Sequence, residues 1–130
     1  MNVKTDTKEK FRVITPLEND ISANMAEELA NMLLECPENE PSHVILNMDH
    51  VKEISPEALE KFASIAEEIR SANRSFVVCC LQNKPLQIAD DSDLLVSLNY
   101  APTESEAWDI LQMEEIEREL LGDEDNDINP

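Results

Sequence analysis

Glycine is nearly absent from this sequence: Gly122 is the only one among 130 residues. Phosphate-binding loops and dinucleotide-binding fingerprints need several glycines, so both are excluded. Cysteine is also rare, and the adjacent pair Cys79 and Cys80 does not indicate a disulfide framework. We therefore expect a reduced, cytoplasmic protein. No apolar run approaches the roughly 20 residues that span a bilayer, and no signal-peptide core opens the chain, so direct membrane insertion is not expected.

Basic residues are scarce as well. Ten lysines and arginines stand against 29 aspartates and glutamates, which gives a formal net charge of -19. Phosphate backbones and anionic membrane surfaces repel such a chain, so nucleic acid is not an expected partner. A basic protein partner, or solubility alone, fits the charge better. The apolar content of 42% is sufficient for one domain with a real core.

A strand that leads into a capped helix is the most informative stretch. Residues 43–48 form an apolar run, and Ser55 follows as a candidate N-cap for a helix. Pro56 suits the first helical position, and Glu57 lies beside the positive end of the helix dipole. Loops at such junctions commonly carry sites, so we expect the functional surface here. The helix is expected to bury a stripe with three- and four-residue spacing, formed by Leu59, Phe62, Ala63, Ala66 and Ile69.

The remaining segments predict alternating strands and helices. An N-terminal hairpin is expected, with strands over 2–5 and 10–15. Ser22 can cap a helix over 23–35 that buries Cys36 at its end. Later in the chain we expect a helix end at Asn73, a buried strand over 75–81 and a short helix starting near 83–85. A strand over 96–101 follows. The last helix is expected to follow a capping box at Thr103 and Glu106 and to stop at Gly122.

This order predicts an α/β fold. We expect a mixed β-sheet with an N-terminal hairpin, a parallel centre and about four helices that cover it. Residues 1–112 are expected to form the domain. Residues 113–130 are expected to hold the end of the last helix and an acidic, flexible C-terminal tail.

Several chemically reactive residues have simpler interpretations. Asp49 and His50 could form a general acid–base pair, but a solvated loop is the more economical interpretation. His43 opens a strand without an evident partner, so we expect it at the surface. Cys79 and Cys80 lie in a strand, where adjacent side chains point to opposite faces, so packing is expected rather than a metal or redox site.

Spacing assigns Met25, Met32 and Trp108 to the core rather than to a cofactor site. The acidic segment 123–127 resembles the start of a calcium loop, but Ile128 stands where that loop needs glycine. A nucleophile, a base and an orienting group cannot be assembled from these pieces. We therefore expect no enzyme activity, no cofactor and no metal site.

The order and spacing of the elements resemble a STAS domain, the module shared by sulfate transporters and anti-sigma factor antagonists. The resemblance covers about residues 2–111, although no single motif carries it. The matching pieces are the N-terminal hairpin, the loop with Asp20 and Ser22, the strand over 44–48 that leads to Val51 and Ile54, and the segment 98–103 before a helix with Ala107.

In anti-sigma factor antagonists the junction commonly reads Asp-Ser-Ser/Thr-Gly, and a partner kinase phosphorylates the second hydroxyl to switch binding off. The matching residues here are Ser55, Pro56, Glu57 and Ala58, so Glu57 occupies the phosphoacceptor position without a hydroxyl. A carboxylate carries about one negative charge against roughly −1.5 to −2 on a phosphate, so it is an incomplete mimic.

Two interpretations of Glu57 stay open. In the first, it holds the domain in a phosphorylated-like state, or control of binding has passed elsewhere. In the second, Ser-Pro-Glu is simply a good helix start, where the glutamate adds about 0.3–1 kcal/mol of stability. Ser55 is a poor candidate for phosphorylation in either case, because a capping hydroxyl is already engaged.

The resemblance implies a non-catalytic regulatory domain of bacterial signal transduction and transcription regulation. Its partner would be a serine kinase/anti-sigma factor or a related signalling assembly. One alternative is a STAS subunit of a membrane transporter complex of the lipid-export type, bound to the transporter ATPase. Another is a small enzyme or acidic scaffold with an unrelated fold. By resemblance, the partner-binding residues would be Asp20, Ser22, Ser55, Glu57, Ala58 and Lys61.

Overall fold

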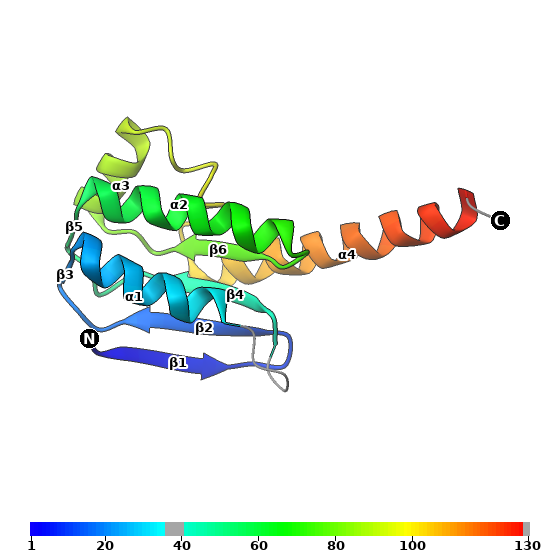
Figure 1. Ribbon diagram of the computed structural model, residues 1–130, viewed down its shortest axis with the longest axis horizontal. Helices are drawn as coiled ribbons and strands as arrows, with labels where there is room; N and C mark the ends of the chain where they lie inside the picture. Colours follow the sequence, from blue (N-terminus) through cyan, green and yellow to red (C-terminus); the bar gives the residue numbers. More distant parts are fainter. Residues whose placement is uncertain (36–40, 129–130) are drawn as a thin grey trace.

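The computed structural model describes residues 1–35 and 41–128, with side chains described up to Leu121. Its main sheet has the strand order β1-β2-β4-β6 (Figure 1). The first two strands pair antiparallel as the predicted hairpin, and β4 pairs parallel with both β2 and β6. The strands are β1 (Val3–Thr7), β2 (Phe11–Pro16), β4 (His43–Asn47) and β6 (Phe76–Cys79). The predicted mixed sheet with a parallel centre is therefore confirmed.

Helices cover both faces of this sheet. On one face, the main core packs between the sheet and the first three helices (Figure 1). On the other face, a smaller core lies between the sheet and the start of the last helix, with Phe11, Ile45 and Val77 facing Ala107 and Leu111. The helices are α1 (Ala23–Leu34), α2 (Pro56–Ser71), α3 (Asn83–Asp91) and α4 (Glu104–Ile128).

Local sequence signals explain most helix boundaries. The predicted apolar stripe of α2 is buried, and Asn73 takes the left-handed conformation that ends this helix, with φ of 60°. The hydroxyl of Thr103 accepts a hydrogen bond from the Glu106 N–H at 3.1 Å, which is the threonine half of the predicted capping box. Cys36 lies outside the described residues.

Two predicted elements differ in the structure. Residues 96–101 do not form a strand: Leu98 donates a backbone hydrogen bond to Leu94, Asn99 has a φ of 54°, and only Ala101 bridges to Cys79 of β6. Helix α4 also continues through Gly122 to Ile128 instead of stopping at this glycine. A glycine inside a helix costs about 1 kcal/mol relative to alanine, which a helix can tolerate.

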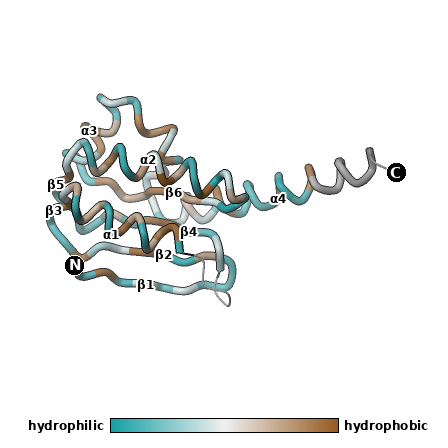
Figure 2. The backbone as a smooth tube through the Cα atoms, in the orientation of Figure 1, coloured by the Kyte–Doolittle hydropathy of each residue, from teal (hydrophilic) through white to brown (hydrophobic). Residues whose placement is uncertain are grey.

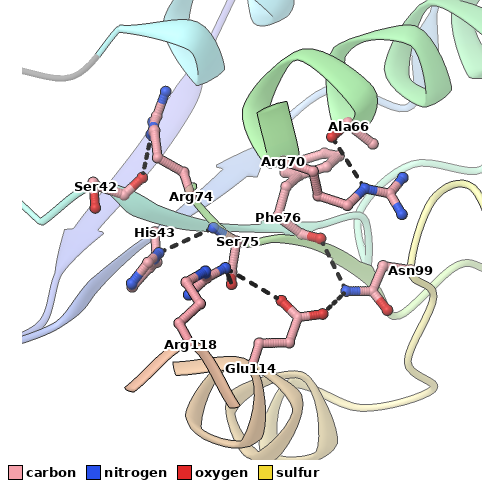
Figure 3. Close-up of polar contacts among 10 residues, drawn as sticks. All are labelled: Ser42, His43, Ala66, Arg70, Arg74, Ser75, Phe76, Asn99, Glu114 and Arg118. Carbon is pink, nitrogen blue, oxygen red and sulfur yellow. Dashed lines mark hydrogen bonds and ion pairs between the residues drawn. The ribbon is translucent and has the colours of Figure 1, made fainter. Parts of the chain in front are cut away.

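A polar network fastens α4 to the end of the sheet (Figure 3). Arg118 donates to the Ser75 hydroxyl, and the Ser75 N–H donates to Nδ1 of His43 at 3.0 Å. Glu114 accepts from the Asn99 amide at 2.9 Å. His43 is thus half-buried with a partner, which corrects the prediction of an unpartnered surface histidine. Burial, followed by the nearby Arg118 charge, lowers the pKa of His43.

The lowered pKa predicts a pH-dependent stability. Below about pH 6.5 the unfolded chain binds a proton that the folded His43 resists, so the free energy of unfolding falls as pH falls, by at most about 1.4 kcal/mol per pH unit. His43→Asn keeps a hydrogen-bond acceptor but cannot titrate. We expect wild type to lose stability relative to H43N between pH 8 and 5.5 in urea denaturation.

Comparing the two proteins at each pH removes the common effect of the many carboxylates. His50→Asn, at the chain's other histidine, controls for the loss of an imidazole. A difference between wild type and H43N that stays constant across this pH range would contradict the prediction.

Candidate functional site

Two helix starts lie side by side at one end of the molecule (Figure 1). A short parallel pair, β3 (Asp20–Ile21) and β5 (Glu53–Ile54), brings them together, with Ile21 opposite Ile54. Ser22 and Ser55 follow these two isoleucines directly, and the Ser55 N–H donates to the Ile21 carbonyl at 3.2 Å. Because paired strands lie about 4.8 Å apart, the two serines are neighbours although 33 residues separate them.

Both serines cap their helices. The Ser22 hydroxyl accepts from the Met25 N–H at 3.3 Å, and the Ser55 hydroxyl accepts from the Ala58 N–H at 3.2 Å. Pro56 fills the start of α2, as predicted. Two positive helix-dipole ends therefore face the same side. The first turn of α1 carries no acidic residue, whereas that of α2 carries Glu57.

Most residues predicted for partner binding are accessible at this end. Asp20, Ser22, Glu57 and Lys61 are exposed, and Ser55 is half-buried. We call these five residues the helix-start surface. Ala58 is fully buried, so its side chain lies in the core and only its backbone N–H serves the cap. The β3–β5 pair thus brings Asp20 and Ser22 next to the α2 residues.

The chemistry of this surface suits recognition of another macromolecule. It presents carboxylates, hydroxyls and one lysine from β3 and from the starts of α1 and α2, and Lys84 of α3 pairs with Glu53 beside it at 3.2 Å. Among the residues that the structure describes, no group of three or more His, Cys, Asp and Glu side chains is placed to hold a metal ion. Within the same residues, every helix is too short or too polar to cross a membrane.

The other predicted candidates are not part of the helix-start surface. Asp49 and His50 contact each other, with Oδ1 and Nε2 3.6 Å apart, and both are more than half exposed, as expected for a solvated loop. Cys79 is buried and Cys80 is half-buried. Burial raises the pKa of both thiols, so the reactive thiolate is disfavoured. Cys80 takes the left-handed conformation, with a φ of 64°. Glycine usually occupies such positions, but this chain has only one glycine.

The core position predicted for Trp108 is wrong. It is 47% exposed and lies over Phe11, with ring centroids 5.9 Å apart, at the edge of the smaller core. Met25 and Met32 are only partly buried against the main core. Sequence reasoning missed this exposed face of α4. The available signal was the recurrence of Trp108, Gln112 and Ile116 at four-residue intervals.

The cap geometry predicts the effect of Ser55→Ala. This change is expected to lower the free energy of unfolding by about 1 kcal/mol, because the Ala58 N–H loses its acceptor. Ser64→Ala, on the exposed face of the same helix, is the matched control and should change stability by no more than about 0.5 kcal/mol. Urea denaturation measures both, and equal effects would contradict the capping role.

Three solved structures place the fold among known proteins. A STAS domain protein from Planctomyces limnophilus is 13% identical with a TM-score of 0.68, over 85% of this chain and 97% of that one. The anti-sigma factor antagonist SpoIIAA, in its unphosphorylated form, is 11% identical with a TM-score of 0.59, over 85% of this chain and 96% of that one. The murine Solute Carrier 26 family member A9 anion transporter is 9% identical with a TM-score of 0.65, over 79% of this chain and 18% of that one.

These identities show the fold alone, and the chain spans less than a fifth of the transporter's length. No curated protein matches the sequence significantly. A family model described as the STAS domain matches residues 2–107. STAS domains generally mediate protein–protein interaction rather than catalysis. With the family model and the sheet topology in agreement, this chain belongs to the STAS domain family.

Proposed function

We propose that this STAS domain is a non-catalytic regulatory module that binds a protein partner through the helix-start surface. The observation that carries the proposal is the β3–β5 pairing, which fixes two capped helix starts next to each other. Sites built on regular elements hold their geometry better than sites on loops. The exposed Glu57 and Lys61 offer charges of both signs, which give specificity to an interface.

The proposed partner class is a serine kinase/anti-sigma factor or a related cytoplasmic, bacterial signalling assembly. Support comes from the shared fold with an anti-sigma factor antagonist. Glu57 takes the position where that family carries a modifiable hydroxyl. The carboxylate supplies about one permanent negative charge beside the α2 N-terminus, so kinase control at this position is absent. We therefore propose that control of binding has passed elsewhere in the protein.

Charge reversal at Glu57 tests the surface. The tagged domain is used to capture proteins from its own cells, and mass spectrometry identifies them. We expect a kinase or anti-sigma type protein with wild type, and at least roughly tenfold weaker binding of the purified partner to Glu57→Lys, because a contact charge has been inverted. Titration calorimetry measures the affinity.

The matched control is Glu68→Lys, the same charge change on the exposed face of the same helix. It lies eleven residues further along α2, or about 16 Å at 1.5 Å per residue. We expect it to bind like wild type. Equal losses in E57K and E68K would indicate a bulk charge effect, and unchanged binding in E57K would remove Glu57 from the interface.

A transporter-associated role is the second candidate. The anion transporter with the same fold supports it, since its chain contains a domain of this shape. In this case the domain would bind an ATPase subunit of a lipid-export complex from the cytosolic side. Fractionation separates the candidates: co-purification with membranes together with an ATPase favours the transporter subunit, whereas a membrane-free complex with a kinase favours the signalling module.

A further inference from the structure

A groove runs between the tip of the N-terminal hairpin and α4. Its wider part has a volume of about 450 Å³ and is lined by Lys8 to Phe11 on one side and by Glu104, Ser105, Trp108 and Gln112 on the other. A second hollow of about 220 Å³ continues along the helix past Glu115, Ile116 and Glu119. Lys10 and Gln112 line both parts, so they form one continuous feature, which we call the α4 groove.

Three apolar side chains, Phe11, Trp108 and Ile116, line the α4 groove among polar and charged residues. Two more exposed apolar side chains of α4, Met113 and Leu120, lie outside its lining on the adjoining face of the helix. Trp108 is 47% exposed, and Ile116, Met113 and Leu120 are each more than half exposed. Met113, Ile116 and Leu120 recur at three- and four-residue spacing, so they share one face of the helix. Contiguous exposed apolar residues on a folded domain commonly mark an interaction surface.

Beyond Leu111, none of the described α4 side chains, up to Leu121, is buried. The apolar contacts of α4 with the sheet come from its first two turns, through Ala107, Leu111 and the half-buried Ile110. One turn further, the polar network with Glu114 and Arg118 holds the helix to the sheet end. Beyond that point Figure 1 shows α4 projecting past the sheet, and Figure 2 shows hydrophobic positions among hydrophilic ones along it.

The charges of α4 indicate which kind of partner the α4 groove would bind. On α4, acidic residues flank the exposed apolar stripe, and Arg118, the one basic residue of this helix, already bonds Ser75. The hairpin side of the groove carries Lys8, Glu9 and Lys10. A second copy would bring two such helices together with like charges, which disfavours association. Nucleic acid would be repelled for the same reason. The acidic residues of α4 up to Leu121 are Glu104, Glu106, Asp109, Glu114, Glu115, Glu117 and Glu119.

We propose that the α4 groove binds a basic amphipathic helix of a partner protein. The apolar face of that helix lies on Trp108 and Ile116 in the groove and extends to Leu120 on the adjoining face of α4. Its lysines or arginines pair with Glu115 and Glu119 at the rim. Lys10 now pairs with Glu115 across the groove, with Nζ and Oε2 3.8 Å apart and both side chains accessible, so an incoming cation can replace it.

The α4 groove is separate from the helix-start surface. The hairpin tip and the distal part of α4 lie at one end of the molecule, and β3, β5 and the α2 start lie at the other (Figure 1). The proposal therefore does not depend on the proposed function. A partner helix in the groove leaves Glu57 free, so the two surfaces can be tested independently.

A model peptide tests the groove in the full chain. The probe is a helical peptide of about 18 residues, roughly five turns, with leucine on one face, lysine on the other and no aromatic residue. Trp108 is the only tryptophan in the chain, so its fluorescence reports directly on the groove. We expect the peptide to shift the Trp108 emission to shorter wavelength, and a peptide with glutamate in place of lysine to cause no shift.

Matched variants locate the binding site. Ile116→Gln with Leu120→Gln should weaken peptide binding roughly tenfold or more, as should Glu115→Lys with Glu119→Lys. The controls are Val96→Gln, at a valine that is 87% exposed on another surface, and Glu27→Lys with Glu28→Lys on the exposed face of α1. We expect both controls and E57K to bind like wild type, and circular dichroism to show all variants folded.

Three results would overturn the proposal. Equal weakening by the α1 and α4 charge variants would mean unspecific attraction to an acidic protein. No fluorescence change with the basic peptide would exclude the groove as a helix-binding site. A homodimer in light scattering that dissociates in the Ile116/Leu120 variant would show that a second copy occupies this face.

Discussion

The pairing of Ile21 with Ile54 is the constraint on which the helix-start surface depends. Both side chains are buried, so the two-residue ladder is held by the core as well as by its own hydrogen bonds. A register slip by one residue would turn an isoleucine to solvent, which the hydrophobic effect opposes. The register in turn determines that Ser22 and Ser55 cap neighbouring helices, because each follows one of the paired isoleucines.

The far end of α1 is held by arginine side chains. Buried Arg74 donates to the carbonyls of Leu33, Leu34 and Ser42 at 3.2, 3.1 and 2.7 Å, and Arg12 of β2 donates to Glu35 at 2.8 Å (Figure 3 shows the Ser42 contact). Cations favour the negative end of a helix dipole and satisfy its free carbonyls. Because the β3–β5 pair holds one end of α1 and the arginines hold the other, the start of α1 is a fixed part of the helix-start surface.

Sequence patterns predicted those elements whose signals are local. The Ser55 cap, the buried stripe of α2, the left-handed Asn73 and the N-terminal hairpin each follow from a few adjacent residues, and the structure contains all of them. Family resemblance, rather than a local pattern, indicates the residues of the helix-start surface. Its geometry depends on a two-residue ladder between segments 33 residues apart, which leaves no periodicity in the sequence.

Three wrong predictions concern residues whose surroundings come from distant parts of the chain. The apolar residues of 96–101 resemble a strand, but the Asn99 side chain donates to the Phe76 carbonyl and the backbone turns there, so tertiary contacts override propensity. Trp108 has core spacing relative to Ala107 and Leu111. Ala107 and Leu111 are the α4 side chains buried against the sheet, with Ile110 partly buried, and Trp108 lies over Phe11 at the edge of this core. His43 gained its partner from the backbone of the neighbouring strand, a contact that only strand order determines.

The distribution of charge separates the two surfaces chemically. At the α2 start, Glu57 lies near Lys61, so attraction to a partner needs a matched pattern of both signs. Along α4 nearly every charge is negative, and attraction there needs only a cationic partner with an apolar face. Screening by salt weakens the long-range attraction of a cationic partner to the negative charges of α4, whereas short-range pairing at the helix-start surface is less affected. Under the two proposals, one fold selects one partner by the pattern of its charges and another by its net charge, because the two surfaces are separate.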